Sequence, residues 1–144
     1  MATQYFCRPL PRLLMLAACF GGIAGCEKGN PTAQVRGKVV AKSGALPSAA
    51  IRVVRFDPAA DSDAKVRKGA SGVINDDGSF ELFTRRPGDG VHLGKYVVTF
   101  AFFRSATDQR PLIPSKYTRA ATSPYQLVVD KDVDDLQFEI DSAP

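Results

Sequence analysis

From residue 33 onward the chain is predicted to fold as an all-β sandwich, and three observations indicate this. Short runs of β-branched and aromatic residues are separated by Gly, Pro, Asn and Asp, which is typical of sandwiches. Asn75-Asp76-Asp77-Gly78 is a strong signal for a tight turn, because Gly accepts a positive φ without a Cβ penalty. After the first 25 residues the sequence shows no repeat and no amphipathic helical pattern.

Seven strands are expected, and the strongest covers residues 95–103. Its alternate positions place aromatic and β-branched residues on one face and a second, largely apolar set on the other. Apolar residues on both faces favour a central strand, or one that a loop or a partner covers. The weaker third strand contains Gly69 and Gly72, which suggest bulges or a bend. The predicted strands are residues 35–42, 51–56, 65–74, 79–84, 95–103, 125–129 and 136–140.

The second strand has no clear inward face. Ile51 and Val53 lie on one side of it, and Val54 and Phe56 lie on the other. An arginine accompanies each pair, so the alternation of apolar and polar residues does not decide which side is buried.

Residues 1–25 are predicted to form a helical signal peptide. Arg8 and Arg12 precede a short apolar run without any charge, which is the layout of a secretory signal. The run is shorter than the roughly 20 residues that an uncleaved transmembrane anchor needs, and it lacks the polar face of a surface helix that packs on a core. The run ends in the four residues Ile23, Ala24, Gly25 and Cys26.

These four residues resemble the lipobox of bacterial lipoproteins. The resemblance implies cleavage before Cys26, diacylation of its thiol and attachment of the mature chain to a membrane. Two or three acyl chains hold a protein stably, whereas one holds it only marginally. We therefore expect a lipidated Cys26 and a polar tether over residues 26–32, followed by a β-sandwich domain over residues 33–144 in the cell envelope, facing the periplasm or the cell exterior.

Charge and cysteine content exclude several classes of protein. The formal net charge is +4, and Arg8 and Arg12 of the signal contribute half of it, so the mature chain lacks the basicity of a nucleic-acid binder. The three cysteines are Cys7, Cys19 and Cys26. A mature domain without further cysteines has no disulfide, and its apolar core must stabilise it.

A series of short motifs follows in a fixed order along the mature chain. It comprises Gly37-x-Val39, a strand over 50–58 that ends in Phe-Asp-Pro, Asp77-Gly78-Ser79-Phe80, Pro87-Gly88-Asp89-Gly90, Gly94-Lys95-Tyr96 and Ile113-Pro114-Ser115-Lys116-Tyr117. This order resembles the small lipoproteins that carry a carboxypeptidase-regulatory-like, transthyretin-like domain. The resemblance implies a seven-strand Greek-key sandwich of the Ig-like or prealbumin-like kind, with an accessory or structural role.

No catalytic, cofactor or metal site is predicted. His92 is the only histidine, and no second His or free Cys is present to complete a zinc site. A Ser-His-Asp triad would require an acid partner that the sequence does not identify. We expect His92 to be a solvent-facing loop residue and the protein to have no enzymatic activity.

Acidic residues gather at two turns. Asn75, Asp76 and Asp77 are interpreted as a hairpin turn, and the residues between the last two strands as a solvated turn. Weak calcium binding is the alternative at both, because carboxylate and amide oxygens are calcium ligands. The second cluster consists of Asp130, Asp132, Asp134 and Asp135.

Three further features are candidates for binding. The basic pairs Arg67-Lys68 and Arg85-Arg86 are suited to anionic headgroups or an acidic glycan, although solubility alone accounts for scattered charges. Residues 104–124 form a long loop that is either functional or clamped onto the sandwich. Phe103 shares the strand of the core aromatic residues but points the other way.

The sequence thus predicts a lipid-anchored cell-envelope protein whose non-catalytic β-sandwich has a structural or binding role. The alternative is an accessory module that binds carbohydrate or peptide for an envelope transport or assembly system. The expected partners are a membrane, through the N-terminal lipid, and an envelope protein or glycan.

Overall fold

The computed structural model describes residues 29–141, and the predicted lipobox residues Ile23, Ala24, Gly25 and Cys26 lie outside them. The described chain consists of strands and one short 3-10 helix, so the all-β prediction is confirmed. The elements are β1 (Thr32–Ala33), β2 (Val35–Ala41), β3 (Ile51–Pro58), β4 (Ala70–Val73), β5 (Ser79–Glu81), β6 (Val91–His92), β7 (Gly94–Phe103), η1 (Ser115–Tyr117), β8 (Gln126–Val129) and β9 (Val133–Ile140).

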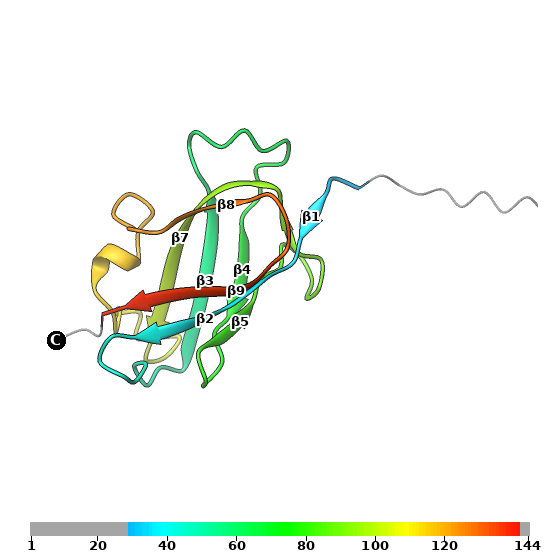
Figure 1. Ribbon diagram of the computed structural model, residues 1–144. Helices are drawn as coiled ribbons and strands as arrows, with labels where there is room; N and C mark the ends of the chain where they lie inside the picture. Colours follow the sequence, from blue (N-terminus) through cyan, green and yellow to red (C-terminus); the bar gives the residue numbers. More distant parts are fainter. Residues whose placement is uncertain (1–28, 142–144) are drawn as a thin grey trace, which may run out of the picture.

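The strands form two main sheets and one short pair (Figure 1). One sheet has the order β5-β2-β9, the other has the order β4-β3-β7-β8, and β1 pairs with β6. All pairings are antiparallel except that of β2 with β9, which is parallel. The strand predicted to be central, β7, is hydrogen-bonded on both sides, to β3 and to β8.

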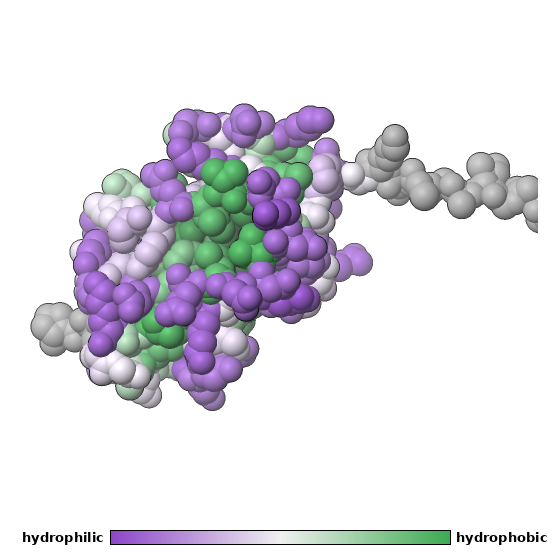
Figure 2. Space-filling model, viewed as in Figure 1, coloured by the Kyte–Doolittle hydropathy of each residue, from purple (hydrophilic) through white to green (hydrophobic). Residues whose placement is uncertain are grey.

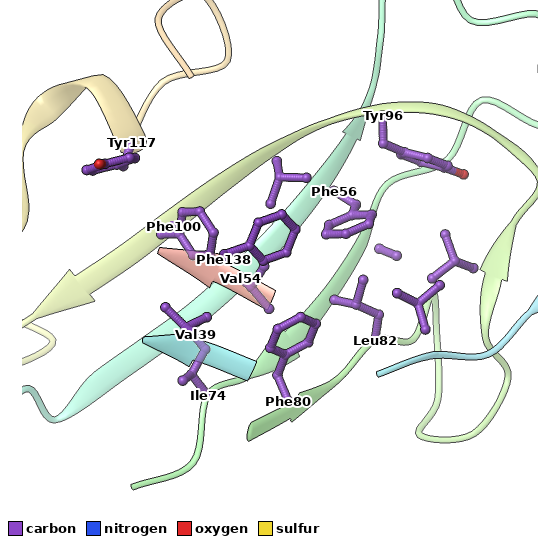
Figure 3. Packing of buried hydrophobic residues seen from close by; sticks show 14 of the residues in the cluster. Val39, Val54, Phe56, Ile74, Phe80, Leu82, Tyr96, Phe100, Tyr117 and Phe138 are labelled. Atoms are coloured by element: carbon purple, nitrogen blue, oxygen red, sulfur yellow. The ribbon is translucent and has the colours of Figure 1, made fainter. Parts of the chain in front are cut away.

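The core lies between the two main sheets and centres on Phe138 of β9. The Phe138 ring lies 5.4 Å from that of Phe100, 6.3 Å from that of Phe56 and 6.1 Å from that of Phe80 (Figure 3). Phe56 and Phe100 belong to the opposite sheet, so these ring contacts join the two layers. Each such pair contributes about 0.5–1.5 kcal/mol beyond the burial of its area.

The structure resolves the ambiguity of the second strand. Val54 and Phe56 are fully buried and therefore form the inward face of β3, whereas Ile51 and Val53 are only half-buried. Arg52 shares that inward face, but it lies at the start of the strand and its guanidinium forms an ion pair with Asp76.

The predicted turn at residues 75–78 is confirmed. Gly78 has a φ of +85°, and its N–H donates to the Asn75 carbonyl at 3.0 Å. The Asn75 N–H in turn donates to the Ser79 carbonyl at 2.8 Å. A Cβ on Gly78 would lie 2.2 Å from the Val39 carbonyl oxygen, so both the backbone angle and the close approach to β2 require glycine here.

Other boundaries differ from the prediction. The third strand covers only Ala70–Val73, because residues 65–69 belong to a loop and the pairing with β3 begins only at Ala70, opposite Phe56. The last strand begins at Val133, because its parallel pairing with β2 starts there, opposite Val35. The two-residue strands β1 and β6 and the helix η1 were not predicted.

Gly37 permits the parallel pairing of β2 with β9. It follows a register shift and lies opposite Leu136, and a Cβ at this position would lie 2.1 Å from the Leu136 carbonyl oxygen. The strands can therefore reach hydrogen-bonding distance at this point only because residue 37 has no side chain.

Substitution of Gly37 by Ala should lower the free energy of unfolding by about 1–3 kcal/mol, because the backbone of β9 must move away. Chemical denaturation of the two variants measures this loss. Gly29→Ala is the matched control, since a Cβ there would meet nothing within 4 Å. Equal stability of the Gly37→Ala variant and the control would contradict the close approach of β2 and β9.

Candidate functional site

The described chain begins at one end of the sandwich (Figure 1). Residues 29–31 lead into β1, which pairs with β6 at this end. The loop 59–69 and the loop 84–90 adjoin the same place, since both contribute to the walls around residues 29–32. The predicted lipidation site therefore precedes this end by only a few residues.

Two adjoining hollows lie at this end, and together we call them the recess. The apolar hollow has a volume of about 380 Å³, and its apolar walls are Pro31, Ala64, Val66, Leu93 and Val128. The basic hollow has a volume of about 350 Å³, and its polar walls are Asn30, Thr32, Lys68, Thr84, Arg85, Asp89 and His92. Asn30, Val66 and His92 line both.

The loop 59–69 is fixed on β7 by hydrogen bonds. The Lys95 N–H donates to the Ser62 hydroxyl at 3.0 Å, and the Lys95 carbonyl accepts from Ala59 N–H at 2.9 Å. The Arg67 guanidinium donates to the carbonyls of Ala59 and Ser62 at 2.7 and 3.2 Å. Arg67 is thus a structural residue of the loop, and its predicted partner in binding, Lys68, is the one at the recess.

Asp89 organises the loop that carries the second basic pair. Its carboxylate accepts the N–H groups of Thr84 and Arg85 at 2.8 Å each and that of Arg86 at 3.0 Å. Burial opposes ionisation of the Asp89 carboxyl, but these three donors outweigh it and lower its pKa. The carboxylate therefore holds the backbone at both arginines.

His92 does not lie in a solvent-facing loop, and that prediction is wrong. It is half-buried in β6, which pairs with β1, and it lies opposite Thr32. Its carbonyl accepts the Tyr96 hydroxyl at 2.7 Å, and its buried Nδ1 atom has no hydrogen-bond partner among the described residues. The Asp89 carboxylate accepts three backbone N–H groups instead.

The first acidic turn is held by protein contacts. Asp77 accepts the Ser79 N–H at 2.9 Å and the Ser79 hydroxyl at 2.6 Å, and the hydroxyl, followed by the N–H, lowers the pKa of the Asp77 carboxyl. Asp76 pairs with Arg52. Both carboxylates thus have protein partners within the hairpin and the strand beside it.

The second acidic cluster covers the loop and the start of β9. Asp132 accepts the Gln34 N–H at 2.7 Å, and Asp134 lies 3.4 Å from Arg36. Over residues 29–141, no group of three or more His, Cys, Asp or Glu side chains is placed to hold a metal ion.

The long loop 104–124 is clamped onto the sandwich. Ile113 and Tyr117 are buried, and the Leu112 N–H donates to the Phe102 carbonyl at 2.9 Å. Phe103 is half-buried and forms a bridge with Pro111. Of the two alternatives for this loop, the structure therefore favours the clamped one.

Asp141 completes the clamp. Its carboxylate accepts the Lys116 ammonium at 2.5 Å and the Tyr117 hydroxyl at 2.8 Å, and it lies 3.1 Å from the Lys42 ammonium. Lys116 first, then Tyr117 and Lys42, hold the pKa of the Asp141 carboxyl well below its usual range.

Comparison with known proteins gives no relative. No family model, no curated protein and no solved structure matches the chain. Within residues 29–141, no helix is long and apolar enough to cross a bilayer.

The sequence identifies the two basic pairs, but it does not show that one member of each pair lines the same hollow. Lys68 and Arg85 are brought together by two different loops, and both line the hollow that also contains His92. The available signal was their shared charge, and it did not indicate which member of each pair is free.

Asp141→Asn should destabilise the protein at pH 7, and this deficit should shrink as the pH falls below about 4. The pKa of Asp141 is lower in the folded state than in the unfolded state. The ionised carboxylate therefore contributes fully to the free energy of unfolding when the pH is above the unfolded-state pKa, and this contribution is lost as the pH falls and the carboxylate is protonated. Urea denaturation at pH 7 and pH 3 measures the difference. Asp135→Asn is the control, because Asp135 is exposed and has no ion pair within residues 29–141. A deficit of the same size at both pH values would contradict the role of the ionised carboxylate.

Proposed function

We propose that this protein is a lipid-anchored cell-envelope protein whose β-sandwich has a non-catalytic, structural or binding role. The observation that carries the proposal is the sequence Ile23-Ala24-Gly25-Cys26 after a charged n-region and an apolar run. The described domain supports it, because its strands start at Thr32. Only a short link separates the cysteine from the fold, as expected for a domain held close to a bilayer.

The geometry around His92 supports a non-catalytic role. A general base must be oriented by a hydrogen-bonded partner. The oxygens of the Asp89 carboxylate, however, are engaged by backbone N–H groups at 2.8–3.0 Å. The Nδ1 atom of His92 has no acid partner among the described residues.

The arrangement of the strands supports the finer assignment of the fold. We propose a Greek-key sandwich of the carboxypeptidase-regulatory-like, transthyretin-like kind. The seven longer strands divide into sheets of three and four, as such a sandwich requires. The Phe138 cluster joins these sheets.

Metabolic labelling with a palmitate analogue should tag the protein in a bacterium, and Cys26→Ser should abolish the tag, because the thiol of Cys26 is the acyl acceptor in this proposal. Cys19→Ser is the matched control and should remain tagged, since that cysteine leaves with the signal. Intact mass of the envelope-derived protein should show a chain that begins at residue 26 with added acyl mass. A chain that retains Met1, or begins at residue 26 without acyl mass, would refute the proposal.

A second candidate is an accessory role in which a peptide or glycan binds between β8 and β9. These two strands are edges of different sheets, and Leu127 of β8 and Leu136 of β9 are only half-buried. Figure 2 shows apolar surface between the positions that β8 and β9 occupy in Figure 1. An exposed strand edge of this kind is suited to an added strand. Peptide and glycan arrays probed with the detergent-solubilised lipidated protein test this role, and the absence of any reproducible ligand would exclude it.

A further inference from the structure

We propose that the recess lies against the bilayer that holds the lipid anchor, and that Lys68 and Arg85 bind the phosphate groups of anionic phospholipids there. This inference rests on the proposed lipidation of Cys26 and adds to it an orientation, a contact surface and a ligand class. Three features of the described residues carry it: the length of the link, the free charge in the basic hollow and the apolar rim beside it.

The link between the anchor and the domain is short. The six Cα–Cα steps from Cys26 to Thr32 span at most about 20 Å, even when they are fully extended. Gly29, Asn30 and Thr32 line the basic hollow and Pro31 lines the apolar one, so the link leaves the domain beside the recess. A domain held by this link must therefore keep the recess end within reach of the headgroups.

The basic hollow presents cations that the domain does not use itself. Neither Lys68 nor Arg85 has an ion pair within residues 29–141. Arg86 and Lys65 also lie free and exposed in the two loops. These side chains are available to phosphate groups, which Lys and Arg bind through charge-assisted hydrogen bonds.

The carboxylates near the recess reduce this positive charge only in part. Among residues 29–141, Asp89 is the one carboxylate that lines the basic hollow, and it accepts three backbone N–H groups. Asp61 lies 2.6 Å from the Lys95 ammonium. Asp63 and Asp130 line the apolar hollow rather than the basic one. The cations therefore dominate on the side of Lys68 and Arg85, and we place the anionic headgroups there.

The apolar hollow provides the second half of the contact. Val128 is 60 % exposed at its edge, and Val66 and Leu93 are half-buried in its wall. Apolar side chains beside basic ones are the composition of surfaces that lie in the headgroup region, where the apolar groups reach toward the acyl chains. Val128 is thus expected to be the residue closest to the lipid.

The chain contains no tryptophan, so one introduced Trp is a unique fluorescent reporter. The lipidated Val128→Trp protein is reconstituted into phosphatidylcholine vesicles with or without phosphatidylglycerol, in which the acyl chains carry bromine. We expect strong quenching of this Trp, and stronger quenching when the anionic lipid is present.

Val73→Trp is the matched reporter. Val73 is 63 % exposed and lies on the other edge strand of the same sheet. It pairs with Val53 near the far end of β7, whereas Val128 pairs with Lys95 at the recess end. Its Trp should keep most of its fluorescence in all vesicles. If Val128→Trp does not fold, Lys65→Trp serves instead, because Lys65 is exposed on the same rim.

Charge reversal tests the headgroup contact. In the Val128→Trp protein, Lys68→Glu with Arg85→Glu should remove the additional quenching that phosphatidylglycerol causes. Arg104→Glu with Arg119→Glu is the control, because these exposed arginines lie in the clamped loop away from the recess, and it should leave that additional quenching intact.

Intact mass of the same samples separates failure of this inference from failure of the proposed function. Absence of acyl mass would refute the anchor itself. A lipidated protein whose two reporters are quenched equally, or not at all, would overturn the orientation while the anchor stands. Quenching that is specific to Val128→Trp but insensitive to the reversal of Lys68 and Arg85 would overturn the headgroup contact.

Discussion

The domain depends on the contact between its two sheets, and that contact is made through Phe138. The Phe138 ring reaches Phe56 and Phe100 of the opposite sheet, and no cysteine follows Cys26 to add a disulfide. Apolar burial must therefore offset the conformational entropy of the chain by itself. Phe138 is held over the core because β9 pairs with β2, and this parallel pairing is possible only where Gly37 lets the backbone of Leu136 approach. One residue without a side chain thus determines whether the central aromatic residue is placed correctly.

The sequence alone was sufficient to predict the elements that are specified by neighbouring residues. The alternation in 95–103 and the turn at Gly78 each specify a structure within a few residues, and both are present. It was insufficient where a residue far away in the sequence determines the local structure. Residues 65–69 were predicted as the start of a strand, but the pairing of β4 with β3 begins only at Ala70, opposite Phe56. The loop before it is held by the Arg67 guanidinium, which donates to the carbonyls of Ala59 and Ser62, and no pattern of apolar residues contains that information.

The candidate site shows the same division. Arg67-Lys68 and Arg85-Arg86 are visible as basic pairs, but the role of each member depends on its three-dimensional surroundings. The Arg67 guanidinium donates hydrogen bonds to backbone carbonyls, whereas Lys68 remains available at the recess. His92 was placed in a loop because a two-residue strand has no period to detect, and only its pairing with Thr32 shows that it belongs to a strand. Long-range pairing, rather than residue type, defines the recess.

The cations around Asp141 and those at the basic hollow have different surroundings. Away from the recess, Asp141 gathers Lys42 and Lys116 and so fixes the loop 104–124, which means that these cations serve the fold. At the recess, Lys68 and Arg85 serve no contact within the described domain. In water an exposed cation is well solvated and adds little to stability, but beside an anionic surface each one adds to the attraction. In the orientation proposed above, the link leaves the domain beside Lys68 and Arg85, so these two cations, which add little to the stability of the fold, favour that orientation.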